Sequence, residues 1–167
     1  MPALITPLMQ HAKSREMSTV VDPQYKNFFA YSGATIFKPN RRELESALGA
    51  AVDLEHVEAL PEALRRLGVE YLLLTLGDAG MALIAADGEV GRVPTTAHEV
   101  YDVVGAGDTV TAYLATMLAG GATPAEAAVI ANFAAGVEVA KLGAATVSTD
   151  EVVEAYDLFG ATGAPAA

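Results

Sequence analysis

The stretch "DVVGAGDTV", residues 102–110, places two glycines and two aspartates in nine positions and then runs into an apolar, helix-like segment. The preceding residues of "HEVYDVV" are strand-like, so the sequence predicts a strand, a Gly-Ala-Gly turn and a helix start. The first backbone N–H groups of a helix have no partner within it, and with the positive end of the helix dipole they form an anion site. Glycine suits such a turn because a Cβ would keep a phosphate away from the backbone.

Asp108 follows this turn directly and admits two interpretations. In the first, it lies in the first helical turn, within reach of a hydroxyl that attacks a phosphorus bound at the anion site. In the second, the stretch is an ordinary capped turn in which Asp108 interacts favourably with the helix dipole. A short Gly-x-Gly is a weak signal, so local chemistry leaves both interpretations open.

The segment "KPNRRELE", residues 38–45, contains a second candidate site. Asn40 and Glu43 are three residues apart, so on a helix they share a face. An amide oxygen and a carboxylate suit a Mg²⁺ ion that keeps several of its waters. The alternative is an N-cap with a first-turn glutamate, which is a very common capping pattern.

The segment "TLGDAG", residues 75–80, is a third candidate. Thr75 ends an apolar, strand-like run, and Gly77 and Gly80 open the chain after it. A hydroxyl and an open turn at the carboxyl end of a strand suit a nucleotide. A plain hairpin loop explains the same residues.

Around these motifs, strand patterns alternate with helix patterns, which predicts an α/β fold with a mostly parallel sheet. We expect one domain over residues 1–160 and a disordered tail over 161–167. The predicted strands cover 18–22, 33–40, 69–77 and a hairpin over 80–94 that turns at "DG". The predicted helices cover 5–15, 41–48, 53–67, 108–118, 124–142 and 149–160.

Composition excludes several classes of protein. Of the 167 residues 52% are hydrophobic and 19% charged, which excludes a disordered polar chain. The net charge of −11 argues against nucleic acid or anionic lipid as a partner. No cysteine is present, and the three histidines lack metal-ligand spacing, so thiolate and zinc sites are not expected. We expect no membrane span and no secretory signal, and therefore a cytoplasmic protein.

Taken in order, these segments resemble the C-terminal part of the ribokinase-like (pfkB family) carbohydrate kinases. The residues that carry the resemblance are "VVDP", "KPNRRE", "TLGDAG", "DVVGAGDT" and "ANFAAGVEVAKLGAATVS". Within the family, "DPQYKNFFAYSGATIFKPN" and "AAGVEVAKLGAATVS" are most similar to the kinase module that phosphorylates heptose phosphate for ADP-heptose synthesis. The resemblance implies a partial three-layer α/β/α fold that lacks the N-terminal strands and the β lid.

The resemblance also implies the catalytic residues. Asp108 would be the base that accepts the proton of the sugar hydroxyl. The N–H groups of Gly105, Ala106 and Gly107 would stabilise the charge that develops on the transferred phosphoryl group.

Cofactor sites follow from the same resemblance. Asn40 and Glu43 would organise Mg²⁺ through its waters, and Asp102 with the "KLGAATV" turn would lie where relatives bind a monovalent cation such as K⁺. The expected ATP-site residues are Asp22 near the triphosphate, Thr75, Gly77 and Gly80 along the groove, and Asn132 near the adenine.

Three departures from the family pattern bear on function. Tyr113 stands where relatives usually have a small residue, and Gln24 replaces a lysine often found after Asp-Pro in heptose kinases. A complete family member is also longer than this chain, and its additional N-terminal part holds the sugar site. We therefore expect an ATP-dependent sugar kinase that is incomplete as this chain alone, with a homo-oligomer or a complementary N-terminal half as partner. The alternative is a non-catalytic nucleotide-binding or oligomerising half-domain.

Overall fold

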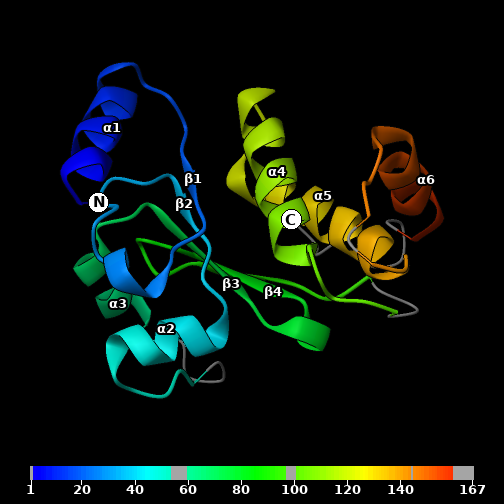
Figure 1. Cartoon of the computed structure of the whole chain (residues 1–167), viewed down its shortest axis with the longest axis horizontal. Coiled ribbons are helices and arrows are strands. Elements are labelled where there is room, and N and C mark those ends of the chain that lie inside the picture. Colours follow the sequence, from blue (N-terminus) through cyan, green and yellow to red (C-terminus); the bar gives the residue numbers. More distant parts are fainter. Residues whose placement is uncertain (1, 54–59, 97–100, 144, 160–167) are drawn as a thin grey trace. The chain divides into compact units, whose positions relative to one another are not determined.

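The computed structural model describes residues 2–53, 60–96, 101–143 and 145–159 (Figure 1). Helices alternate with strands in its first half, and helices alone form its last third. The elements are α1 (Pro2–Ser14), β1 (Val20–Val21), η1 (Tyr25–Asn27), β2 (Ile36–Phe37), α2 (Arg41–Leu48), α3 (Leu60–Leu67), β3 (Tyr71–Thr75), η3 (Gly77–Ala79), β4 (Met81–Ala85), β5 (Val90–Val93), α4 (Ala106–Ala119), α5 (Pro124–Val139) and α6 (Thr149–Phe159).

The five strands form one mixed sheet in the order β1-β2-β3-β4-β5. The first three strands are parallel, with Val20 opposite Ile36 and Ile36 opposite Tyr71. A hairpin joins β4 to β5, and the Ala85 N–H donates to the Glu89 carbonyl at 2.9 Å beside its turn. The predicted α/β class and the predicted hairpin are therefore confirmed.

Local capping signals place most helix ends where the sequence predicts them. Asn40 and Thr123 cap α2 and α5, and each makes a capping box with the glutamate three residues on. Gly49 ends α2 in the left-handed conformation, with φ 68°. The prediction for α5 was three residues too long, because the helix ends at Val139.

Helix α1 differs from prediction at its N-terminal end. Helix α1 begins at Pro2, so Pro7 lies inside it rather than in its first turn. The described part of the helix predicted over 53–67 is α3 (Leu60–Leu67), so the prediction of a helix is confirmed there. The expected helical residues 54–59 lie outside the described residues, as does the predicted tail.

The chain divides into two compact units, which we name unit 1 (Met1–Leu76 and Ala82–Gly91) and unit 2 (Gly77–Met81 and Arg92–Ala167). Unit 1 has a core of fully buried aliphatic and aromatic side chains, each of which contributes roughly 1.5–3 kcal/mol to folding. These side chains include Phe37, Leu44, Leu64, Leu72, Leu74 and Ile84.

Unit 2 is built on the packing of α4, α5 and α6. Phe133, Ala134 and Val152 form its buried cluster, and Tyr113 packs against them. The Tyr113 hydroxyl donates to the Val147 carbonyl at 3.2 Å, and burial raises the pKa of this phenol. The departure from the family pattern at Tyr113 is thus accommodated within the helical packing.

The strand expected in "HEVYDVV" is wrong in its described part. Tyr101 and Val103 lie in no strand, and their side chains are 61% and 68% exposed. The N–H groups of Tyr101 and Asp102 instead donate to the carbonyl of Val139, at 2.8 and 3.3 Å. The segment before the glycine turn is therefore hydrogen-bonded to the last residue of α5.

Candidate active site

The Gly-Ala-Gly turn forms the N-terminus of α4. Gly105 is the N-cap, with φ 99°, a conformation that other residues rarely adopt. Its carbonyl accepts the Thr109 N–H at 2.9 Å, so the helix starts immediately after it. Just before the turn, the Asp102 carboxylate accepts the Val104 N–H at 2.9 Å.

The N-terminus of α4 differs from the N-termini of α2 and α5 in one respect. In α2 and α5 the N-cap side chain accepts an N–H of the first turn, whereas Gly105 has no side chain to do so. The amides after Gly105 are therefore left for an external acceptor. Asp108 lies in this first turn and is exposed. The predicted base and the predicted anion-binding amides thus share one helix end.

A buried carboxylate that the sequence did not single out lies against this turn. Glu138, near the end of α5, is 1% exposed. A Cβ added to Gly105 would stand 2.7 Å from Glu138 Oε1, so only glycine leaves room for this carboxylate. The other oxygen, Oε2, is buried without a hydrogen-bond partner in the described structure.

Burial raises the pKa of Glu138 above its ordinary value. The Ala145 N–H and the Lys141 ammonium act in the opposite direction, while the carboxylates of Asp102 and Asp108 raise the pKa further. Three acidic groups thus interact around the turn. No cluster of three histidine or acidic side chains in the described residues has the arrangement of a metal site.

Glu138→Gln is expected to stabilise the protein at pH 8. The pKa of Glu138 is raised in the folded state, so the folded wild type binds the carboxyl proton more tightly than the unfolded chain does. The stability of the wild type therefore falls as the pH rises from about 4.5 through the folded-state pKa. Glutamine is neutral throughout, so the advantage of the variant should vanish near pH 4. Urea unfolding at several pH values measures this, with the exposed Glu154→Gln as a control that should show no such trend. An equal or lower stability of Glu138→Gln at pH 8 contradicts the assignment.

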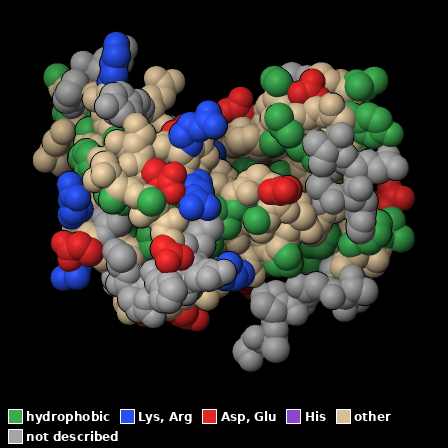
Figure 2. Space-filling model, turned by 90° about the horizontal axis from the view of Figure 1, so that it is seen from below, with side chains coloured by type: hydrophobic (Ala, Val, Ile, Leu, Met, Phe, Trp, Pro, Cys, Tyr) green, Lys and Arg blue, Asp and Glu red, His purple; other side chains and the backbone are tan. Residues whose placement is uncertain are grey.

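Unit 2 has few basic side chains that could attract an anion. Its lysine and arginine residues are Arg92 and Lys141. Figure 2 shows that the part of the surface formed by this unit carries acidic groups among hydrophobic side chains. Lys141 is paired with Glu151 and donates to the Thr146 carbonyl at 2.8 Å. This pairing, with hydrogen bonds from Ser148, lowers the pKa of Glu151 to about 2.

Gly80 and Asn132 converge on one segment of unit 2. The Asn132 amide donates to the Pro94 carbonyl at 2.8 Å, and its side chain is buried. A Cβ on Gly80 would stand 2.2 Å from the Val93 carbonyl oxygen, so this glycine lies directly against the same stretch. Asn132 thus has a structural partner, and its predicted place near an adenine stays a prediction. Gly77, at the start of η3, is exposed.

A separate set of predicted residues gathers in unit 1, where β1, β2 and β3 end. Asp22 follows β1, and Asn40 forms an isolated parallel bridge with Thr75 at the end of β3. Between them Lys38, which the sequence did not single out, makes an ion pair with Asp22 at 2.8 Å. The carboxyl edge of the parallel strands therefore carries polar groups from three neighbouring strands.

Asn40 and Glu43 form the capping box that was the alternative interpretation of this motif. The Asn40 side chain accepts the Glu43 N–H, and Glu43 Oε2 accepts the Asn40 N–H, both at 2.8 Å. Glu43 Oε1 lies outside this box, and a carboxylate oxygen beside an amide suits a hydrated Mg²⁺. The donor set therefore fits the ion, and the metal role stays a prediction.

Lys38 and Glu138 were missed although both stand in segments that carry the family resemblance, "KPNRRE" and "ANFAAGVEVAKLGAATVS". Lys38 directly precedes Pro39 and Asn40, to which the local pattern assigns a strand end and a helix N-cap. Glu138 interrupts an apolar helix pattern. In both cases the available signal was a charged residue at a position where the strand or helix pattern predicts a buried side chain. In the described residues, the buried polar or charged side chains are Lys38, Asn132 and Glu138.

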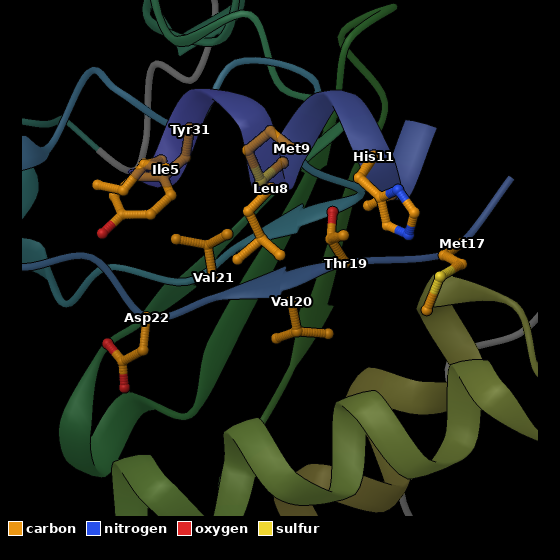
Figure 3. Close-up of a pocket in the computed structure, with 11 residues that line it drawn as sticks. Ile5, Leu8, Met9, His11, Met17, Thr19, Val20, Val21, Asp22 and Tyr31 are labelled. Atoms are coloured by element: carbon orange, nitrogen blue, oxygen red, sulfur yellow. The ribbon is translucent and has the colours of Figure 1, made fainter. Parts of the chain in front are cut away.

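Unit 1 also has an apolar groove between α1 and β1, with a volume of about 430 Å³. Leu8, Met9, Val21 and Tyr31 are among the residues that line it. Figure 3 shows Asp22 at one end, with its carboxylate pointing away from α1. The groove therefore meets the polar edge of the strands at Asp22.

The family model of the pfkB family carbohydrate kinases matches residues 4–151. This chain belongs to that family. It is 48% identical to the Bifunctional protein HldE of Shewanella piezotolerans over 91% of this chain and 32% of that protein. It is 45% identical to the Bifunctional protein HldE of Paramagnetospirillum magneticum over 89% and 31%. This pfkB-family chain thus spans about a third of the length of these curated relatives.

Solved structures agree with the family fold. Arabidopsis thaliana ribokinase, complexed with ribose and ATP, superposes with a TM-score of 0.82 at 23% identity, over 93% of this pfkB-family chain and 52% of that one. Giardia lamblia ribokinase gives 0.79 at 27% identity, over 93% and 55%. The predicted ribokinase-like fold is confirmed. Within the described segments, no helix combines the length and apolarity that crossing a membrane requires.

Proposed function

We propose that this chain is the nucleotide-binding part of an ATP-dependent kinase that phosphorylates a hydroxyl of a sugar phosphate, with heptose 7-phosphate as the substrate. The observation that carries the proposal is the N-terminus of α4, where a glycine N-cap leaves the first amides without a side-chain acceptor beside exposed Asp108. The family supports sugar phosphorylation, and the similarity to HldE proteins supports a heptose phosphate.

Asp108 acts as the general base in this proposal. Its carboxylate accepts the proton of the sugar hydroxyl as that oxygen attacks the terminal phosphorus of ATP. The new P–O bond forms while the bond from this phosphorus to the bridging oxygen breaks, and ADP leaves with that oxygen. The amides of Gly105, Ala106 and Gly107 stabilise the negative charge on the transferred group.

The metal-binding residues in this proposal are Asn40 and Glu43, which hold Mg²⁺ through its waters. Bound Mg²⁺ neutralises charge on the phosphates and orients them. Asp102, which lies just before the glycine turn, is the proposed side-chain contact of a monovalent cation such as K⁺. Thr75, Gly77 and Gly80 line the ATP groove.

A coupled assay of ADP release with ATP–Mg²⁺ and heptose 7-phosphate tests the proposal. The chain is assayed alone and with a separately expressed N-terminal half of the kinase fold. We expect sugar-dependent ADP release in at least one of the two mixtures. Sugar-independent release in both, or none, contradicts the proposed kinase.

Glu43→Gln is expected to weaken ATP–Mg²⁺ binding about tenfold, because the variant loses the charge that attracts the hydrated ion. It should also destabilise α2 by about 1 kcal/mol, since the capping box is weakened. Glu126→Gln is the matched control, because Glu126 makes the same capping box with Thr123 in α5. Calorimetry should show unchanged affinity for Glu126→Gln. A similar loss of affinity in both variants would assign Glu43 to capping alone.

A second candidate function is a non-catalytic nucleotide-binding or oligomerising half-domain. The chain spans about half of the solved kinases and a third of the HldE proteins. Its partner would be a second copy or an N-terminal half. Binding of ATP–Mg²⁺ without sugar-dependent ADP release in both mixtures supports this alternative.

A further inference from the structure

Lys38 is a buried lysine at the carboxyl edge of the parallel strands. It follows β2 directly, and its N–H donates to the Val21 carbonyl at 2.8 Å, which continues the pairing of β1 with β2. This register brings Lys38 beside Asp22, and the Lys38 Nζ lies 2.8 Å from Asp22 Oδ2. The lysine side chain is 5% exposed and the aspartate side chain 38% exposed. The ammonium is therefore enclosed, while the carboxylate reaches solvent.

Stability alone does not explain this pair. Removing a lysine from water is costly, and a buried ion pair is often no more stabilising than apolar residues of similar volume. Another ion pair of unit 1 shows the contrast, because it lies at the surface: the side chains of Arg65 and Glu62 are 71% and 62% exposed. A charge placed inside the sheet edge thus points to a function at that edge.

The position of Asp22 suggests what that function is. In open α/β sheets ligands bind beyond the carboxyl ends of the strands, and Asp22 stands there with Asn40 and Thr75. An uncompensated carboxylate at this edge would repel a triphosphate, and the chain already has a net charge of −11. The Lys38 ammonium cancels the charge of Asp22 and fixes the orientation of its carboxylate.

We propose that Lys38 is a positioning residue for the nucleotide triphosphate: it acts through Asp22, which it keeps oriented and electrically compensated beside the phosphates and their Mg²⁺. This inference rests on the proposed binding of ATP–Mg²⁺. It assigns Lys38 no direct contact with the nucleotide, because its side chain is enclosed.

A double-mutant cycle on the full chain tests the inference. Calorimetry measures the affinity for ATP–Mg²⁺ of the wild type, Lys38→Met, Asp22→Asn and the double variant. We expect Lys38→Met to bind at least tenfold more weakly, and the double variant to bind as Asp22→Asn does, since Lys38 acts only through Asp22. Arg65→Met makes the same change of net charge in an exposed pair and should bind within twofold of the wild type.

The outcomes separate this inference from the proposed function. A wild type that binds ATP–Mg²⁺ neither alone nor with the N-terminal half overturns both. A wild type that binds, with an unchanged affinity in Lys38→Met, overturns the inference alone and assigns the ion pair to stability. The inference alone is also overturned if Lys38→Met weakens binding by the same factor in the wild-type background and in the Asp22→Asn background. If Lys38→Met does not fold, the double variant is compared with Asp22→Asn, and a difference in affinity above threefold overturns the inference.

Discussion

Asp108→Asn is expected to lower the rate of sugar phosphorylation by about 10²–10⁴-fold, the contribution typical of a general base. The amide cannot accept the proton of the attacking hydroxyl, although it has nearly the shape of the carboxylate. Asp108 is exposed in the first turn of α4, so its replacement leaves no buried group without a partner. The affinity for ATP–Mg²⁺ should therefore change little while kcat falls.

The control for this variant is Asp87→Asn in the turn between β4 and β5. Asp87 accepts the Glu89 N–H at 3.1 Å, a bond that the asparagine oxygen can also accept. The change in net charge is the same, and the rate should stay within twofold of the wild type. Retained turnover in Asp108→Asn, in whichever mixture supports activity, contradicts the role of Asp108.

Gly80→Ala is expected to destabilise the protein by about 2–5 kcal/mol, the sum of backbone strain and overpacking. Gly80 has φ 84°, and a Cβ there would stand 2.2 Å from the Val93 carbonyl oxygen and 2.6 Å from the Thr95 N–H nitrogen. These are backbone atoms, so no side chain can rotate away to relieve the clash. The strand end must move, and with it Pro94, whose carbonyl accepts the Asn132 amide.

Gly77→Ala is the matched control three residues earlier. Gly77 also has a positive φ, 63°, but a Cβ there would meet nothing within 4 Å. Only the backbone strain remains, so we expect a loss of about 1–2 kcal/mol. Urea unfolding of both variants gives the comparison. Equal losses of stability in the two variants would show that the close contact between the new Cβ and the Val93 carbonyl adds no cost.

Signals that act over a few residues predicted the fold well. Asn40 and Thr123 cap helices because a side-chain oxygen meets an N–H three residues away, and the chain sequence alone specifies that spacing. Gly49 and Gly68 have positive φ and directly follow the last residues of α2 and α3, which end where the predicted helices over 41–48 and 53–67 end. Alternation of strand and helix patterns was likewise enough to predict an α/β sheet, because each pattern reflects the period of one element.

Signals that depend on distant residues were missed or misjudged. The apolar residues of "HEVYDVV" predicted a strand, yet the N–H of Tyr101 bonds to Val139, 38 residues later, and not to a neighbouring strand. Helix periodicity could not reveal that the Glu138 carboxylate packs against Gly105. Asn132, predicted near a nucleotide, was not expected to hold Pro94. Each of these contacts joins residues that the sequence separates by more than thirty positions.

The sequence by itself determined the family of this chain, its alternation of strands and helices, and the identity of the glycine turn that ends in Asp108. Those features depend on residue types at short, regular spacing, and that spacing is contained in the sequence itself. Only the tertiary structure decided that α4 begins on a glycine lying over the buried Glu138, and that Lys38 is enclosed beside Asp22. The physical reason is that burial and desolvation depend on what surrounds a side chain, and those surroundings come from elements far away in the sequence.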